Sequence, residues 1–197
     1  MKLNIGFFLG SKLGRGNSYS TLTKNVAKWL NQSKHNVIFG GTESGIMKDL
    51  VVNLNKNELK VTAIITKGLM KEHNKCSYFN ELIVVEDLKK RTEQFLLRSD
   101  VFLALPGGIG TLFEVVEIFN KKVLGETSKK LFIINDFNYW NPLKNLLEHM
   151  IKENFLDKKT VLKNIEFINF CEVDKKYLIN RERPLSGHQY ELQPLFQ

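Results

Sequence analysis

Residues 99–117 read SDVFLALPGGIGTLFEVVE, the pattern of a buried strand, a glycine-rich loop and the start of a helix. The apolar run at 101–106 is continuous rather than alternating, which is typical of a strand buried on both faces. Pro106 and three glycines interrupt this run, and a helix is expected to begin soon after them. A strand, a loop and a helix in this order predict one unit of a parallel α/β sheet.

The same unit recurs along the chain. Six other apolar runs have the length of buried strands, at residues 4–9, 36–40, 60–67, 81–87, 131–136 and 165–170. Between them, residues 18–32, 43–57 and 141–156 place apolar side chains at helical spacing. The alternation predicts an α/β fold, a doubly wound, mainly parallel sheet of about seven strands with helices on both faces.

The chain of 197 residues, with 43% hydrophobic content, is expected to form a single domain over residues 1–197. The tail after about residue 177 has weak periodicity and is expected to be an added helix or an unstructured end. No segment has the composition of a signal peptide or a membrane span, so a cytoplasmic location is expected.

Charge, cysteine and histidine content restrict the class of function. The two cysteines, Cys76 and Cys171, and the four scattered histidines suit neither a disulfide framework nor a metal site. The net charge of +8 comes mainly from lysines spread along the chain, without a recognisable nucleic-acid-binding module. We therefore expect no metal, no nucleic acid and no membrane as partner, whereas a small anionic ligand is compatible with the charge.

Three glycine-rich loops each follow a predicted strand and precede a predicted helix, at residues 9–18 (LGSKLGRGNS), 40–45 (GGTESG) and 106–111 (PGGIGT). In a parallel sheet such loops meet at the carboxyl edge, where backbone N–H groups and helix N-termini form an anion site. The P-loop and G-x-G-x-x-G motifs are both missing from the chain, which disfavours a nucleoside triphosphatase and a hydride-transferring enzyme.

Thr111 and Glu114 have the spacing of a capping box, in which the threonine oxygen accepts from an early helical N–H and the glutamate reaches back. The alternative is that Glu114, in the first turn of a helix that starts beside the glycine loops, faces a bound ligand. A carboxylate beside a phosphate site is unfavourable unless it is paired or used in the chemistry.

Arg91 is the candidate partner for that carboxylate. It lies three residues after Leu88 and four before Phe95, and these two are expected to share the buried stripe of a helix. An arginine on that stripe must either extend to solvent or meet an anion. The alternative, that Thr92 faces inward and Arg91 lies at the edge, is equally compatible with the spacing.

The segment PGGIGTLFE fits the motif PGGxGTxxE. Together with RTEQFLLRSDVFLALPGG at 91–108, GGTESGIMKDL at 40–50 and NDFNYWNPLKNLLEHMIKENFL at 135–156, it makes the chain resemble the LOG family, from Gly6 to about Leu156. These are cytokinin riboside 5′-monophosphate phosphoribohydrolases, which are often labelled lysine decarboxylases. The resemblance implies a Rossmann-like fold, a homodimer, no cofactor, and hydrolysis of the N-glycosidic bond of AMP or an N6-modified AMP.

The resemblance also implies site residues. It places the family's catalytic arginine on Arg91 and its catalytic glutamate on Glu114. The implied phosphate-binding and nucleotide-lining residues are Gly107, Gly108, Gly110 and Thr111, with Gly10, Ser11, Gly40, Gly41 and Gly45. Departures from the family pattern put the identity of the base in question more than the reaction, and they fall at Thr42, Lys48, Thr92, Phe113 and residues 120–123.

A non-catalytic carrier of a nucleotide or a pterin phosphate is the main alternative function. Such a protein would keep the glycine loops of this fold but would need neither Arg91 nor Glu114. A decarboxylase that uses pyridoxal phosphate would need a Schiff-base lysine, and no lysine in the sequence stands in such a context.

Overall fold

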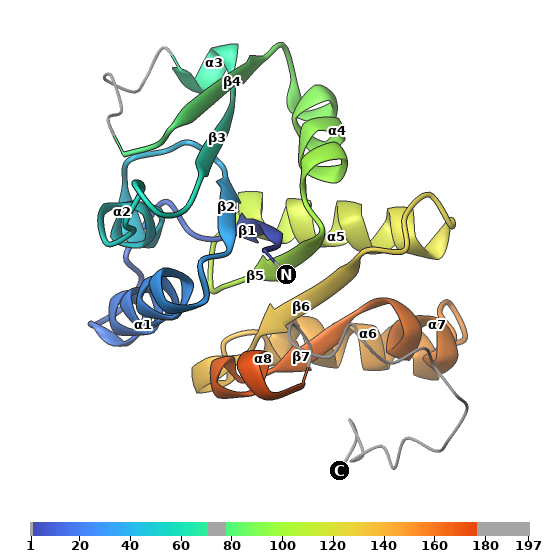
Figure 1. The fold of residues 1–197 in the computed structure, drawn as a ribbon. Coiled ribbons are helices and arrows are strands. Elements are labelled where there is room, and N and C mark those ends of the chain that lie inside the picture. The colour runs from blue at the N-terminus through green and yellow to red at the C-terminus, as the bar shows by residue number, and fades with distance from the viewer. Residues whose placement is uncertain (1, 71–77, 177–197) are drawn as a thin grey trace.

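The computed structural model describes residues 2–70 and 78–176, in which seven parallel strands form one sheet (Figure 1). The predicted tail after about residue 177 lies outside the described residues. The strands are β1 (Asn4–Phe8), β2 (Asn36–Phe39), β3 (Val61–Thr66), β4 (Glu81–Val85), β5 (Val101–Ala104), β6 (Lys130–Ile134) and β7 (Glu166–Ile168). Their order across the sheet is β4-β3-β2-β1-β5-β6-β7, so the predicted doubly wound fold is confirmed.

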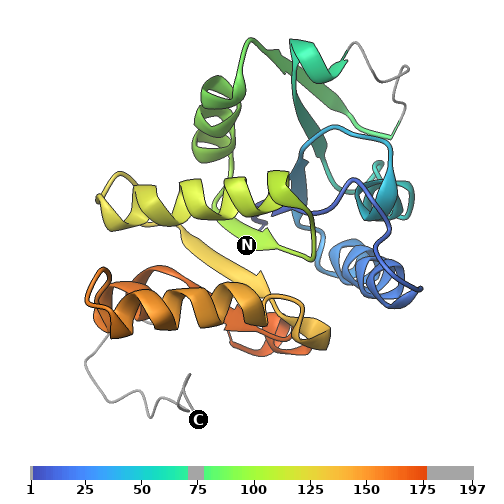
Figure 2. The same ribbon diagram turned by 180° about the vertical axis from the view of Figure 1, so that it is seen from behind.

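Helices connect the strands and cover both faces of the sheet. Helices α1, α2 and α8 pack on one face, and α4, α5, α6 and α7 pack on the other (Figures 1 and 2). The bounds are α1 (Ser18–Ser33), α2 (Gly45–Val52), α3 (Lys67–Met70), α4 (Leu88–Arg98), α5 (Ile109–Val123), α6 (Asn141–Lys152), α7 (Lys158–Asn164) and α8 (Phe170–Lys176). A short 3-10 helix, η1, spans Asp136–Asn138. None of the helices in the described ranges is long and apolar enough to cross a membrane.

The two helical layers explain why most strands are apolar at successive positions. Phe7 and Phe8 of β1 point to opposite faces, and each is buried in the core on its own side. Phe8 packs against Phe95 of α4 and Phe102 of β5, with ring centroids 5.2 and 5.5 Å away. Strand β4 alternates between half-buried and exposed residues instead, because it is the edge strand.

The strand order reverses between β1 and β5, which brings the loops after these two strands side by side at the carboxyl edge of the sheet. The loops are joined by backbone hydrogen bonds, from Leu105 N to Phe8 O at 2.9 Å and from Gly10 N to Pro106 O at 3.1 Å. Doubly wound sheets typically bind their ligands between the loops at this point, where the strand order reverses.

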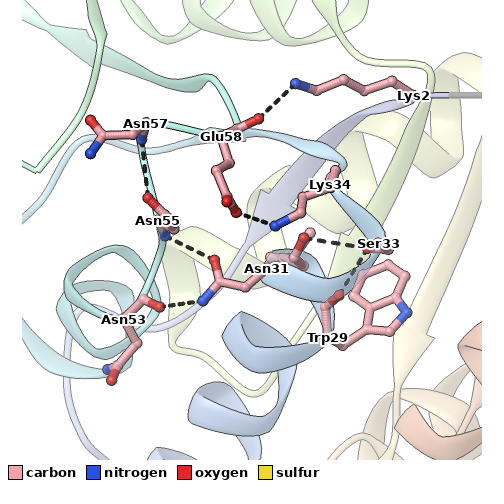
Figure 3. A network of polar contacts seen from close by, with 10 residues as sticks. Lys2, Trp29, Asn31, Ser33, Lys34, Asn53, Asn55, Asn57 and Glu58 are labelled. Carbon is pink, nitrogen blue, oxygen red and sulfur yellow. Dashed lines mark hydrogen bonds and ion pairs between the residues drawn. The ribbon is translucent and has the colours of Figure 1, made fainter.

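A network of asparagine side chains stabilises the opposite, amino-terminal edge (Figure 3). The amide of Asn31, near the end of α1, donates to Asn53 O and accepts from Asn55 N, both at 2.8 Å. Close by, Lys34 pairs with Glu58. These contacts fix the connection between α2 and β3 to α1, so the amino-terminal edge carries structural contacts while the glycine loops lie at the other edge.

Candidate active site

The structure brings the three glycine-rich loops together. Besides the bond from Gly10 to the loop after β5, Met47 N at the start of α2 donates to Gly10 O at 3.1 Å. The backbones approach so closely that a Cβ on Gly45 would lie 2.2 Å from Lys12 N, and Gly45 also has a left-handed φ of +58°. A side chain at this position would therefore separate the first two loops.

The third loop leads into α5 and forms the candidate phosphate cradle. Gly108 is the N-cap of α5, and a Cβ on Gly108 or Gly110 would meet no atom within 4 Å, so these two glycines border open space. Gly107 packs tightly against Thr111, whose Oγ1 would lie 2.2 Å from an added Cβ. The free N–H groups at the start of a helix of 15 residues favour an anion at this point.

The predicted capping box is wrong. Helix α5 begins at Ile109, and its N-cap Gly108 has no side chain, so Thr111 is the third helical residue and lies buried. Glu114 is the sixth residue and belongs to the second turn rather than the first. Its carboxylate therefore cannot serve the helix N-terminus, and it turns toward α4 instead.

Arg91 and Glu114 form a buried ion pair between α4 and α5. Arg91 Nη1 lies 3.0 Å from Glu114 Oε1, and the two side chains are only 12% and 13% exposed. Arg91 Nε also donates to Ile64 O in β3, at 3.1 Å. A Cβ on Gly40 would lie 2.4 Å from Arg91 Nη2, so the missing side chain at Gly40 gives the guanidinium its room.

Thr92 faces inward, as the second alternative for this turn of α4 expected, but Arg91 does not lie at the edge, because it is buried in the pair with Glu114. Thr92 is buried, and its Oγ1 lies 2.5 Å from Glu117 Oε2 on α5 and 3.2 Å from Leu88 O. Leu88, expected on the buried stripe with Phe95, is 47% exposed instead. It is the first residue of α4, where the helix leaves the edge strand β4 and extends beyond the core.

Burial raises the pKa of Glu114 to about 7 from its ordinary 4.5. The Arg91 guanidinium opposes this rise in the pKa, and the nearby Glu117 carboxylate adds to it. Glu114 therefore exchanges its proton near neutral pH, which is the property of a carboxyl that acts as both acid and base.

A small cavity of about 10 Å³ lies against the ion pair. This volume is room for about one water molecule. Apolar side chains make up most of its wall, and the lining residues are Phe8, Leu88, Arg91, Thr92, Phe95, Phe113, Glu114 and Ile118. Glu114 is thus shielded from bulk water on this side, which accounts for its raised pKa.

Sequence reasoning missed an aromatic group beside the phosphate cradle. Tyr139 Oη donates to Gly107 O at 2.5 Å, and its ring packs edge-on against Tyr19 of α1, with centroids 5.4 Å apart. Phe137 contacts the same Tyr19 ring and has a left-handed φ of +59°. The segment NDFNYWNP carried the signal, because aromatic residues after a strand lie at the carboxyl edge.

Among the described residues, no group of three or more His, Cys, Asp or Glu side chains could hold a metal ion.

Comparison with known proteins decides the family. Residues 45–174 match the family model described as "Possible lysine decarboxylase". A cytokinin riboside 5′-monophosphate phosphoribohydrolase of Rhodococcoides fascians is 30% identical over 169 residues, which cover 83% of this chain and 85% of that protein. This chain belongs to the LOG family.

Plant members of the LOG family align over a shorter part of their length. The Arabidopsis thaliana protein of the same name is 30% identical over 149 residues, which are 76% of this chain and 65% of that protein. A rice relative aligns over 66% of its length, so this chain spans just under two thirds of these plant proteins.

Solved structures share the fold at lower identity. The X-ray structure of a structural genomics target superposes with a TM-score of 0.63 at 18% identity, over 89% of this chain and 97% of that one. The molybdenum cofactor carrier protein of Chlamydomonas reinhardtii superposes with a TM-score of 0.62 at 14% identity, over 85% and 89% of the two chains. A molybdenum cofactor binding protein of Rippkaea orientalis has a TM-score of 0.60 at 20% identity, over 86% and 91%.

Proposed function

We propose that this LOG-family chain hydrolyses the N-glycosidic bond of a nucleoside 5′-monophosphate, AMP or an N6-modified AMP, to the free base and ribose 5-phosphate. The observation that carries the proposal is the buried Arg91–Glu114 ion pair, because Glu114 lies on α5, the helix that begins at the glycine cradle. The names of the relatives support the substrate class, cytokinin riboside monophosphates. We expect the enzyme to act in the cytoplasm.

In this proposal the substrate phosphate binds at the start of α5. The N–H groups of the loop and the helix dipole attract the phosphate, and the open space beside Gly108 and Gly110 leaves room for it. The phosphate-binding residues are then Gly107, Gly108, Gly110 and Thr111. The other two loops, with Gly10, Ser11, Gly40, Gly41 and Gly45, line the rest of the nucleotide.

The reaction breaks the bond between the sugar C1′ and the base nitrogen, whose electrons leave with the base. The sugar then resembles an oxocarbenium ion, and the Glu114 carboxylate stabilises its positive charge. A water oxygen forms the new bond to C1′, and Glu114 takes one proton of that water and passes it to the nitrogen of the departing base, which leaves the carboxylate as it started. Arg91 holds Glu114 in place, because its own position is fixed by Ile64 O.

We also propose that the enzyme is a homodimer formed through α5. Its outer side carries an apolar stripe at helical spacing, Ile109, Phe113, Val116 and Val123, which are 82%, 47%, 47% and 40% exposed. Since the inner side with Val115 and Ile118 is apolar too, α5 is apolar around most of its circumference, as in a helix covered on both sides. The stripe includes Phe113 from the wall of the Glu114 cavity, which would put the partner beside the site.

A carrier of a nucleotide or of a pterin phosphate is the second candidate, because two of the similar structures are named as molybdenum cofactor binding or carrier proteins. Those similarities, at 20% and 14% identity, concern the fold. A carrier would need the cradle but would gain nothing from a carboxyl desolvated against an arginine, and we therefore favour the hydrolase.

The deciding experiment incubates the purified protein with AMP, N6-isopentenyl-AMP, GMP, CMP and UMP. Chromatography of the products should show free base and ribose 5-phosphate in equal amounts from at least one adenine nucleotide. Tight binding of a nucleotide without release of base from any of the five would favour the carrier instead.

A further inference from the structure

Two successive carbonyl groups of the third glycine-rich loop are held by other parts of the chain. The Pro106 carbonyl accepts a hydrogen bond from Gly10 N in the first loop, at 3.1 Å. The Gly107 carbonyl accepts one from Tyr139 Oη, in the connection between β6 and α6, at 2.5 Å. The first bond joins two backbones, whereas the second depends on a single side-chain hydroxyl. The proposed reaction does not yet use Tyr139.

Aromatic packing fixes the position of the Tyr139 hydroxyl. The Tyr139 ring packs edge-on against Tyr19 of α1 and against Trp140, with ring centroids 5.4 and 5.1 Å away. Trp140 is buried, and its backbone N–H donates to Asn135 Oδ1 at 2.7 Å. A ring held in this way has little freedom to move, so the hydrogen bond from its hydroxyl to Gly107 requires little further ordering.

The bond to Gly107 O determines which way the next amide faces. The peptide bond between Gly107 and Gly108 is trans, so its C=O and N–H groups point in opposite directions. Because the oxygen faces the Tyr139 hydroxyl, the Gly108 N–H points away from the aromatic group. Gly108 is the exposed N-cap of α5, where the phosphate binds in the proposed function.

This peptide has a glycine on each side, which allows it a second orientation. A reversal of the peptide plane meets little steric resistance when neither neighbouring residue has a Cβ. In the reversed orientation the Gly107 oxygen would face the phosphate, and the two would repel each other. Of the two orientations, the Tyr139 hydroxyl stabilises the one that presents an N–H to an anion.

We propose that Tyr139 is a positioning residue for the phosphate: its hydroxyl holds the peptide between Gly107 and Gly108 with the N–H toward the phosphate and the carbonyl away from it. This inference rests on the phosphate site of the function proposed above. Tyr139 contacts the backbone of the cradle, whereas the chemistry is assigned to Arg91 and Glu114. Its hydroxyl therefore contributes to the binding of a phosphate monoester and not to the cleavage of the N-glycosidic bond.

Tyr139→Phe tests the proposal, because it removes the hydroxyl and keeps the ring that packs against Tyr19 and Trp140. Isothermal titration calorimetry should show the Kd of ribose 5-phosphate rising about 3–10-fold, the usual effect of one lost hydrogen bond. Adenosine, which has no phosphate, should bind the variant and the wild type equally. In the 13C,15N-labelled variant, the carbonyl resonance of Gly107 should move upfield, and the Gly108 amide should respond less to ribose 5-phosphate than in the wild type.

Tyr78→Phe is the matched control, since it removes a tyrosine hydroxyl just before β4, at the amino-terminal edge of the sheet. Its affinity for ribose 5-phosphate should equal that of the wild type. The proposal would be overturned if Tyr139→Phe bound ribose 5-phosphate as tightly as the wild type, if it lost affinity for adenosine to the same extent, or if the wild type bound no ribose 5-phosphate.

The kinetics of base release separate this inference from the hydrolase function. In Tyr139→Phe the KM for AMP should rise while kcat stays within about twofold of the wild type, because the phosphate is held alike in the ground state and the transition state. If no nucleotide is hydrolysed, the hydrolase function fails, whereas the affinities for ribose 5-phosphate still decide the role of Tyr139.

Discussion

At the scale of single residues, Glu114 is a carboxyl on which burial and ion pairing act in opposite directions. Desolvation raises its pKa, and the Arg91 contact at 3.0 Å lowers it. Burial prevails, because the guanidinium also serves Ile64 O and apolar side chains surround the pair. A carboxyl of this kind is costly for stability, which is the usual mark of a group kept for its chemistry.

Replacement of Glu114 by Gln keeps the shape of the side chain and removes its acid–base function. Base release from the preferred nucleotide should fall by about 10²–10⁴-fold, the usual contribution of a positioned acid or base. Steady-state kinetics with chromatographic detection measures the loss, and the circular dichroism spectrum should match the wild type. Glu86→Gln, at a surface pair with Lys67, is the control and should retain full activity. Turnover by Glu114→Gln within a few-fold of wild type would remove Glu114 from the mechanism.

The pKa of Glu114 also predicts how stability depends on pH. The folded protein binds this proton more tightly than the unfolded chain, because the pKa is about 7 instead of 4.5. The stability from this group is therefore present at low pH and is lost as pH rises through 7. Urea unfolding of the wild type and Glu114→Gln at pH 5.5 and 8.0 should show the wild type gaining about 1–2 kcal/mol relative to the variant at the lower pH. A difference that does not vary with pH would contradict the raised pKa.

At the scale of elements, the ion pair depends on a loop far from it in sequence. Helices α4 and α5 supply the two charged side chains, and the loop after β2 supplies the room, since Gly40 faces Arg91 Nη2. The hydrogen bond to Ile64 O ties the same guanidinium to β3. Two adjacent strands and two helices thus fix one arginine.

Gly40→Ala should separate activity from stability. The new Cβ would lie 2.4 Å from Arg91 Nη2, which is the end of a flexible side chain, so the guanidinium should move and the backbone should not. Base release should fall by about 10²-fold through misplacement of the pair. The free energy of unfolding should change by about 1 kcal/mol or less.

Gly68→Ala is the matched control for Gly40→Ala, because a Cβ there meets nothing within 4 Å. Its activity should equal that of the wild type. Full base-release activity in Gly40→Ala would show that catalysis does not depend on the exact position of the Arg91 guanidinium.

At the scale of the whole molecule, the sheet brings the glycine-rich loops and the Arg91–Glu114 ion pair to the same edge, and α5 connects them. The N-terminus of α5 borders the cradle, its second turn carries Glu114, and its outer stripe is uncovered by the described residues. In the proposed function, one helix therefore takes part in phosphate binding, in the chemistry and in the dimer contact.

Val116→Lys tests the dimer. A charge in the middle of the α5 stripe should convert the dimer to a monomer, because a buried unpaired lysine is strongly unfavourable at an interface. Sedimentation velocity at micromolar concentration measures the change. Leu146→Lys on α6, at a residue with the same exposure of about one half, should leave the dimer intact. A monomeric wild type, or a dimer that survives Val116→Lys, would contradict this interface.

The seven strands and the longer helices between them followed from the sequence alone, because continuous apolar runs, helical spacing and glycine-rich breaks are local properties of the chain, whereas the short helices α3, α7 and α8 did not. The same local reasoning identified Arg91 and Glu114 as candidates, through their spacing and their resemblance to a known motif. It failed where a helix terminus had to be located: Thr111 resembled a cap, but α5 starts two residues earlier, at Ile109.

Only the tertiary structure decided which side chains meet. The contact between Arg91 and Glu114 spans 23 positions and depends on how α4 and α5 cross the sheet, a distance that no local pattern contains. The Thr92–Glu117 contact, the Tyr139 bond to Gly107 and the fit of Gly40 to the guanidinium have the same origin. The raised pKa of Glu114 does too, because desolvation is produced by groups that the fold brings together from distant parts of the chain.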